Sequence, residues 1–224
     1  MNTRLQKQYF GIEEQNKEKI LHNEVEIDST WGKLIWGVTL QIDLGEKVRD
    51  SLCKYQEELE KLEPDNLLLL PRQYQHISFN QVVFWGGQYE LGTEGTWNKV
   101  SEEFLKAFKE QNRKHNSFKV EFSKLVATTG GIIWCGYDEN DEMENLREEF
   151  IKILPFPKET IRKNHIIHST VARYKNSLDN PGKVLDYIDK NNRLAEMVVN
   201  NIILRNELVF PSIKTESLAE IELI

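Results

Sequence analysis

The chain predicts an α+β fold in which two similar lobes enclose a central cleft. Runs rich in β-branched and aromatic residues alternate with stretches whose apolar residues recur every three to four positions. The order strand, helix, strand occurs twice, and the last strand of each copy carries a His-x-Ser/Thr pattern, beginning at His76 and at His168. A duplicated order of this kind favours two lobes with approximate two-fold symmetry, each bringing one central strand to a shared cleft.

The first copy begins at residues 34–43, whose sequence LIWGVTLQID predicts a strand. A helix follows and stops before Pro64, with one apolar stripe made of Val48, Leu52, Tyr55, Leu59 and Leu62. Residues 67–70 and 75–85 predict two more strands, and the first histidine motif lies in the second of them. The spacing of aromatic residues then predicts a helix over 97–113.

The second copy begins with two strands joined by a tight turn, at residues 118–128 and 131–137. A helix through residues 143–154 is expected to start at a capping box formed by Asp141 and Glu144. The second histidine motif follows in a strand at 165–174. After it we expect a helix, a strand and a final edge strand, at residues 182–194, 197–209 and 212–223.

Length and composition indicate a soluble globular protein with a substantial core. The 224 residues, 39% hydrophobic and 29% charged, suit a helical arm at residues 1–30 and one bilobal domain at 31–224. Neither an apolar run long enough to span a bilayer nor a signal peptide is evident, which predicts a cytoplasmic location and no membrane partner. Cys53 and Cys135 are expected to be free thiols in a reducing compartment.

The net charge of −7 excludes a surface built to bind long duplex nucleic acid, because such binding depends on many basic side chains near phosphates. A local basic pocket would have to draw on residues near the two motifs, namely Arg72, Arg162, Lys163, Arg173 and Lys175. We expect the protein to be a monomer that does not bind long duplex nucleic acid.

The two motifs combine side chains that suit chemistry on a phosphodiester. Side chains two residues apart in a strand point to the same face, so His76 shares a face with Ser78, and His168 shares one with Thr170. One neutral and one protonated imidazole supply a base and an acid near neutral pH, and two hydroxyls can bind the charged oxygens. A single motif is more often structural, but two copies in matching contexts favour a shared catalytic site.

These motifs, His-Ile-Ser-Phe at 76–79 and His-Ser-Thr-Val at 168–171, resemble the signature of the two-histidine phosphoesterase superfamily, which includes cyclic phosphodiesterases and the proteins called 2′-5′ RNA ligases. The resemblance covers roughly residues 34–210 and implies two mainly antiparallel sheets with outer helices around the cleft. It also implies that His76 and His168 are catalytic and that Ser78 and Thr170 bind substrate. No carboxylate or Cys/His cluster with metal-ligand spacing surrounds the motifs in the sequence, so no metal or cofactor is expected. Ser169 departs from the pattern, because the family has an apolar residue there.

Strand alternation extends the expected site to two aromatic residues. Tyr74 and Tyr174 lie an even number of residues from the histidines and could stack on a nucleobase, although a structural role is equally compatible with the pattern. Arg173 is expected on the opposite face of its strand, away from the cleft. His165 and His168 are also expected on opposite faces, which argues against a metal site between them.

The motifs and the resemblance together predict a metal-independent phosphodiesterase that acts on a small nucleotide or an RNA end. The candidate substrates that the resemblance implies are a 2′,3′-cyclic phosphate, a 2′-5′ linkage and a cyclic oligonucleotide signal. The sequence does not identify which of these is the substrate. It also does not identify which histidine is the acid and which is the base. Two alternatives from other classes stay open. One is a catalytically silent nucleotide- or RNA-binding module of the same fold, and the other is a scaffold whose histidines lie apart in the core.

Overall fold

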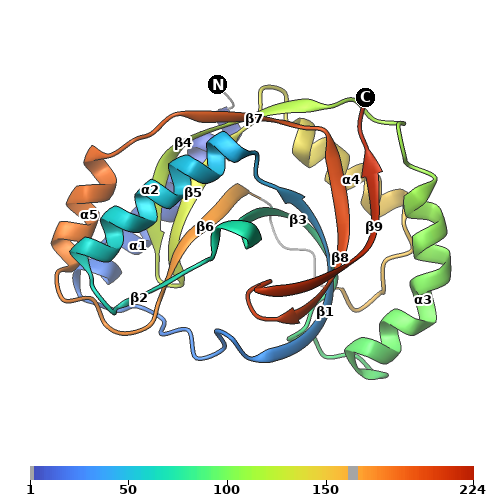
Figure 1. Cartoon of the computed structure of the whole chain (residues 1–224), viewed down its shortest axis with the longest axis horizontal. Coiled ribbons are helices and arrows are strands. Elements are labelled where there is room, and N and C mark those ends of the chain that lie inside the picture. Colours follow the sequence, from blue (N-terminus) through green and yellow to red (C-terminus); the bar gives the residue numbers. More distant parts are fainter. Residues whose placement is uncertain (1–2, 161–165) are drawn as a thin grey trace.

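The computed structural model describes residues 3–160 and 166–224, and within these ranges the chain forms two antiparallel sheets with helices packed around them (Figure 1). The four-stranded sheet has the order β3-β1-β8-β9 and the five-stranded sheet the order β2-β6-β5-β4-β7. The expected α+β fold with two mainly antiparallel sheets is confirmed.

The elements of the first copy follow the expected order. They are β1 (Leu34–Asp43), α2 (Glu46–Leu62), β2 (Leu67–Leu69), a 3-10 turn η1 (Arg72–Tyr74), β3 (His76–Val83) and α3 (Gly92–Lys109). The second copy comprises β4 (Phe118–Thr128), β5 (Gly131–Tyr137), α4 (Glu142–Ile153), β6 (Ile167–Tyr174) and α5 (Pro181–Lys190). The remaining elements are the N-terminal helix α1 (Thr3–Leu21) and the strands β7 (Ala195–Val199), β8 (Asn201–Val209) and β9 (Lys214–Glu222).

Three expectations about these elements were wrong in detail. The segment 197–209 is two strands in different sheets, because the chain leaves the five-stranded sheet after Val199 and enters the four-stranded one at Asn201. Helix α3 starts five residues earlier than its apolar pattern predicts, at Gly92. The capping box is absent from the described start of α4: Asp141 makes no side-chain cap, and the Asp138 carboxylate instead accepts from the Met143 amide at 2.7 Å.

Each of the two crossover helices covers the sheet of the other lobe. Helix α2 follows β1 but packs on the five-stranded sheet, where Tyr55 meets Trp134 edge to face at 5.4 Å between ring centroids. Helix α4 follows β5 but packs on the four-stranded sheet, where Phe150 meets Phe79 at the same distance. The chain therefore crosses repeatedly between the lobes, and the two strands that carry the motifs, β3 and β6, lie in contact.

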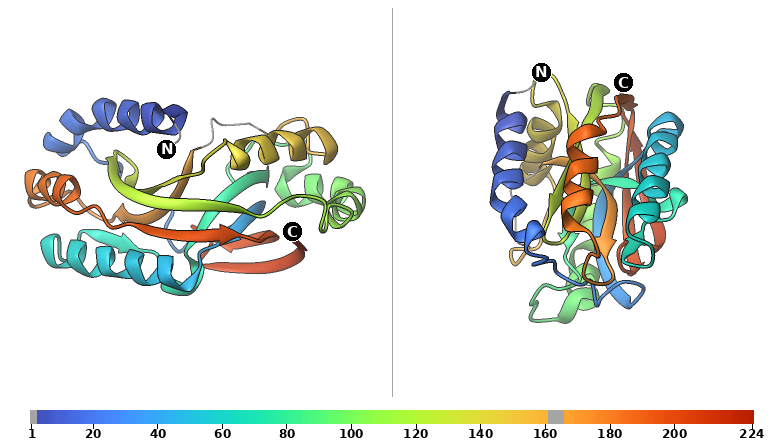
Figure 2. Two further views of the ribbon diagram at one scale, coloured as in Figure 1. Left: turned by 90° about the horizontal axis from the view of Figure 1, so that it is seen from above. Right: turned by 90° about the vertical axis from the view of Figure 1, so that its left-hand side faces the viewer.

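The N-terminal helix belongs to the same core as both lobes. Leu5, Tyr9 and Ile20 of α1 are fully buried against the five-stranded sheet. Figure 2 shows α1 on one side of this sheet and α2 on the other. Because both faces are covered, every residue of β5 is buried, which explains its continuous apolar sequence GIIWCGY. Among residues 3–160 and 166–224, every helix is too short or too polar to cross a bilayer.

Candidate active site

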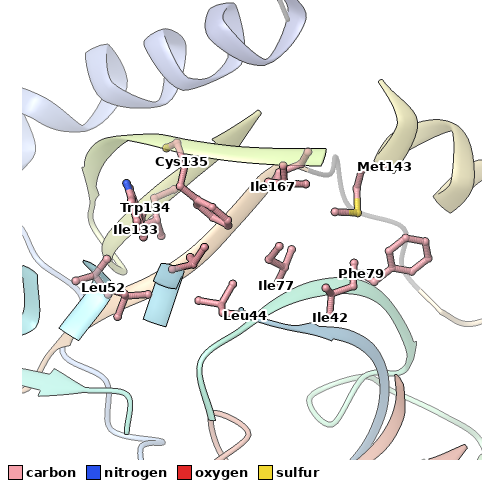
Figure 3. Packing of buried hydrophobic residues seen from close by; sticks show 14 of the residues in the cluster. Ile42, Leu44, Leu52, Ile77, Phe79, Ile133, Trp134, Cys135, Met143 and Ile167 are labelled. Atoms are coloured by element: carbon pink, nitrogen blue, oxygen red, sulfur yellow. The ribbon is translucent and has the colours of Figure 1, made fainter. Parts of the chain in front are cut away.

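The first motif has the alternation expected of a strand with one buried face. Ile77 and Phe79 of β3 are fully buried, whereas His76 is half-buried and Ser78 is exposed. Figure 3 shows Ile77 and Phe79 among the packed apolar residues of the core, with Met143 of α4 beside them. The core thus fixes one face of β3, and the imidazole and hydroxyl are left on the other face.

The second motif alternates in the same way. His168 and Thr170 of β6 are half-buried, whereas Ser169 and Val171 are fully buried. The neighbouring strand β5 pairs Cys135 with His168, so these two side chains share a face. Ser169, the departure from the family pattern, faces away from the histidine, as expected.

A β-bulge changes the end of the second motif. In the pairing of β5 with β6, Ile133 is opposite Thr170 but Ile132 is opposite Ala172, so β6 carries one extra residue, Val171. Alternation is reversed after that point, and Arg173 shares the face of His168. The expectation that Arg173 points to the rear was therefore wrong.

The same bulge removes Tyr174 from the site. Its side chain is fully buried, and its hydroxyl donates to the carbonyl oxygen of Thr128 at 3.1 Å. A ring buried in this way offers no face to a nucleobase, so the structure does not place Tyr174 where stacking was expected. Burial also raises the pKa of its phenol far above the ordinary value, which keeps it protonated.

Tyr74 contributes to the site through its backbone. It lies in η1, before β3 begins, so the alternation argument that placed its ring beside His76 does not apply. The Nδ1 of His76 donates to the carbonyl oxygen of Tyr74 at 2.7 Å, because a carbonyl can only accept. In the neutral imidazole this bond leaves the lone pair on Nε2, the nitrogen that would act as a base.

A partly buried ion pair lies next to His76. The register of β1 with β3 pairs Asp43 with His76, and Arg205 of β8 binds the Asp43 carboxylate with both guanidinium nitrogens at 2.7 and 2.8 Å. Burial is the main cause that lowers the pKa of His76, and the charges of Arg205 and Arg173 add to it, against the Tyr74 carbonyl and Asp43. His76 is therefore neutral near pH 7.

Arg173 also connects the two sheets. Arg173 lies on the five-stranded sheet, yet it is near enough to influence the pKa of His76 on the four-stranded sheet. Its guanidinium carbon lies 4.9 Å from the ring centroid of Phe210, which follows β8, and its Nη1 is 3.2 Å from the Asp28 carboxylate. Arg173 of β6 therefore contacts the segment that follows β8 of the other sheet.

Arg147 of α4 ties the two motifs together from the buried side. Its guanidinium donates to the carbonyl oxygens of Ser78 and Phe79, each at 2.8 Å, and of Ile166 at 3.3 Å. The side chain is 1% exposed, and burial lowers its pKa to about 10, which leaves it charged at neutral pH. One cation therefore binds the backbone of β3 and the residue just before β6.

Tyr9 of α1 holds the second motif in a similar way. Its hydroxyl accepts from the amide of Ile167 and reaches the carbonyl oxygens of Ile167 and Gly136. Ile167 is the residue before His168, so the N-terminal helix braces the backbone of the motif. The helix lies on the His168 face of the sheet, because Tyr9 packs at 5.1 Å against Tyr137, two residues along β5 from Cys135.

The remaining basic candidates do not gather at the histidines. Arg72 is held by Glu46 and Asp50, in ion pairs of 2.5 and 2.8 Å, and Lys175 is exposed. Arg162, Lys163 and His165 lie outside the described residues. Within the part of the chain that the structure describes, His, Cys, Asp and Glu form no group of three or more placed to hold a metal ion.

No family model and no curated protein sequence matches this chain. Solved structures do match. A conserved protein of unknown function from Agrobacterium tumefaciens, ATU0111, has a TM-score of 0.61 at 11% identity and covers 86% of this chain and 90% of its own. TT0787 of Thermus thermophilus matches with a TM-score of 0.57 at 15% identity. The match covers 83% of this chain and 97% of TT0787. Escherichia coli LigT in complex with 3′-AMP matches with a TM-score of 0.52 at 10% identity. The match covers 85% of this chain and 99% of LigT.

These matches agree with the resemblance carried by the two motifs. One matching structure is described as a phosphoesterase, and this chain shares the fold of that protein and of LigT. At such low identities the likeness shows the fold alone. The predicted fold is therefore confirmed, and the roles of the site residues stay predictions.

Proposed function

We propose that this protein is a metal-independent phosphodiesterase of the two-histidine type, acting on a small nucleotide or an RNA end. The observation that supports this proposal concerns the motif strands: β3 and β6 come from different sheets and lie in contact, and each has its histidine and its hydroxyl on one face. Two proton-transfer groups with a cation nearby suit a phosphodiester better than a neutral ligand.

His76 is the base in this proposal and His168 the acid. The lowered pKa of His76 and the bond from its Nδ1 to the Tyr74 carbonyl favour a neutral imidazole whose Nε2 can accept a proton. In hydrolysis of a 2′,3′-cyclic phosphate, the attacking water forms a bond to phosphorus and gives its proton to His76. The bond from phosphorus to one ribose oxygen breaks, and that oxygen takes a proton from His168.

The hydroxyls of Ser78 and Thr170 donate to the charged oxygens on phosphorus, and Arg173 adds a positive charge. Each proton transfer contributes a factor of about 10²–10⁴ to the rate. This apparatus suits a phosphodiester that already has an advantage, such as a strained cyclic phosphate or a linkage with a free vicinal hydroxyl. Ordinary DNA has neither and is not expected to be cleaved.

Known structures of one protein with this fold favour nucleotide-like substrates. LigT of Escherichia coli has been crystallised with 3′-AMP, phosphate, ATP and NADP⁺. We extend this preference for phosphorylated nucleosides to the present chain. The substrates we propose are 2′,3′-cyclic ends and 2′-5′-linked ribonucleotides, with cyclic oligonucleotide signals as a further member of the same class.

The test is a hydrolysis screen with these substrates, comparing the wild type with His168→Ala and with His22→Ala. His22 is a matched control, because its side chain is 71% exposed and it lies just after α1, outside the proposed site. Turnover that survives in His22→Ala and is lost in His168→Ala supports the proposal. Binding of nucleotides by the wild type without any turnover would instead identify a silent binding module.

Two further measurements decide the mechanism. Activity is expected to persist in excess chelator, and its loss with recovery upon adding a divalent ion would overturn the metal-independent chemistry. A 2′-5′ linkage whose vicinal 3′-hydroxyl has been removed should be cut far more slowly than its parent. Equal rates would show that an activated water attacks the linkage directly.

A further inference from the structure

Two aromatic side chains that follow β3 and β8 form a cluster with a cation of β6. Trp85 and Phe210 meet edge to face, with ring centroids 5.1 Å apart, and the Arg173 guanidinium lies over the Phe210 ring at 4.9 Å. Both rings are half-buried, so each packs on the protein and leaves part of its surface open. We call Trp85, Phe210 and Arg173 the aromatic cluster.

Trp85 lies on the same face of the four-stranded sheet as His76. In β1, Gly37 and Asp43 share one face, and Asp43 is the register partner of His76. A Cβ on Gly37 would lie 3.2 Å from the Cβ of Trp85 and 3.0 Å from the carbonyl oxygen of Val83. The absence of a side chain at Gly37 therefore makes room for Trp85 on the histidine face.

The turn after β8 brings Phe210 toward the first motif. Ser212 accepts a hydrogen bond from the side-chain nitrogen of Gln41 at 2.9 Å, and Gln41 is the register partner of Ser78. The turn thus folds over the histidine face of the sheet, and Phe210 lies two residues before Ser212. The aromatic cluster therefore lies farther along the face of the sheet that carries the proposed phosphate site.

Arg173 connects the cluster to that site. The positive charge of Arg173 lowers the pKa of His76, and its guanidinium lies over the Phe210 ring. Its Nη1 donates to the Asp28 carboxylate at 3.2 Å. A flat apolar surface next to a cation suits a group that is aromatic and attached to a phosphate. A nucleotide has both parts.

We propose that Trp85 and Phe210 form a subsite that stacks the nucleobase of the substrate, with Arg173 between this base and the phosphate. The proposal rests on the proposed function and deepens it, because it makes the base a recognised part of the substrate. Stacking on an aromatic ring is tolerant of base identity, since every base has a π-face. The enzyme should therefore accept different bases but discriminate against a substrate with none.

The experiment compares a 2′,3′-cyclic mononucleotide with ribose 2′,3′-cyclic phosphate, which lacks the base. The variants are Trp85→Leu and Phe210→Leu, with Phe10→Leu as the control, because Phe10 is an aromatic residue 60% exposed on α1. Each site variant is expected to raise KM for the nucleotide about tenfold, to leave kcat nearly unchanged, and to leave KM for the base-free substrate unchanged. Phe10→Leu should change neither KM.

A KM for the nucleotide that is unchanged in both site variants overturns the subsite, and so does an equal rise of KM for both substrates. If the wild type turns over neither substrate, the proposed function fails and calorimetric titration tests the subsite separately. Tighter binding of AMP than of ribose 5-phosphate, lost in Trp85→Leu or Phe210→Leu, supports the subsite. Equal affinities for the two ligands overturn it.

Discussion

Arg147 Nη2 lies 2.8 Å from the carbonyl oxygen of Ser78, so a buried cation in α4 binds the backbone of the first motif. The same guanidinium reaches Ile166, two residues before His168. Arg147→Met would leave these carbonyls without their donor, and each unsatisfied buried polar group costs about 1–3 kcal/mol. We expect the free energy of unfolding, measured with denaturant, to fall by at least about 3 kcal/mol, within the range for breaking a buried charge network.

The matched variant is Arg147→Lys, which keeps the charge but offers a single ammonium in place of the planar fork. It should recover part of the lost stability, and kcat should fall more than KM rises in the fraction that folds, because the hydroxyl and imidazole of the first motif would be displaced. Full stability in Arg147→Met would show that the three carbonyls do not depend on this side chain.

The two histidines are expected to act as one unit. His76→Ala and His168→Ala should each remove nearly all turnover, and the double variant should lose little more, because the acid and base steps depend on each other. Single-turnover rates of all four proteins measure the coupling. Independent losses that multiply in the double variant would count against a shared site.

The sequence could predict the strands and motifs because those features are local. The β-branched runs gave β1, β3 and β5 to within one or two residues, and strand alternation correctly placed Ser78 with His76 and Ser169 behind His168. The duplicated order of elements also predicted the two sheets. Each of these inferences depends on residues near one another in the chain.

The predictions that were wrong, and the residues that were missed, depend on contacts between segments far apart in the chain. Val171 has the sequence of an ordinary strand residue, so nothing local signals the bulge that exchanges the faces of Arg173 and Tyr174. Arg147 lies far along the chain from Ser78, and its role appears only when α4 packs on the opposite lobe. The weak periodicity of α1 likewise gave no sign that Tyr9 braces the second motif.

The pH profile should respond to the ion pair beside His76. A base must be neutral, and the pKa of His76 lies below its ordinary value of 6.5, so the acidic limb of the kcat/KM profile should lie below that value. Arg205→Met removes a positive charge that lowers this pKa and leaves Asp43, whose charge raises it. The acidic limb of the profile should therefore move to higher pH.

Asp43→Asn is the opposing control for this prediction. It removes the negative charge and leaves Arg205, so the pKa of His76 should fall and the acidic limb should move to lower pH. Opposite shifts in the two variants would identify His76 as the group that titrates there. A limb that stays in place in both variants would assign it to another residue.

Ser169 and Ser78 lie on opposite faces of the motif strands and should respond differently to the loss of a hydroxyl. Ser169 is 0% exposed, and its oxygen has no hydrogen-bond partner among the residues the structure describes. Because a buried hydroxyl without a partner costs about 1–3 kcal/mol, Ser169→Ala should raise the free energy of unfolding by about 1 kcal/mol and leave turnover unchanged.

Ser78→Ala, at an exposed position, should leave stability unchanged and lower kcat, because a donor to the phosphoryl oxygens is lost. Denaturant unfolding and initial rates on both variants provide the comparison. A stability loss in Ser169→Ala would mean that its hydroxyl has a partner, and full activity in Ser78→Ala would remove that residue from the substrate site.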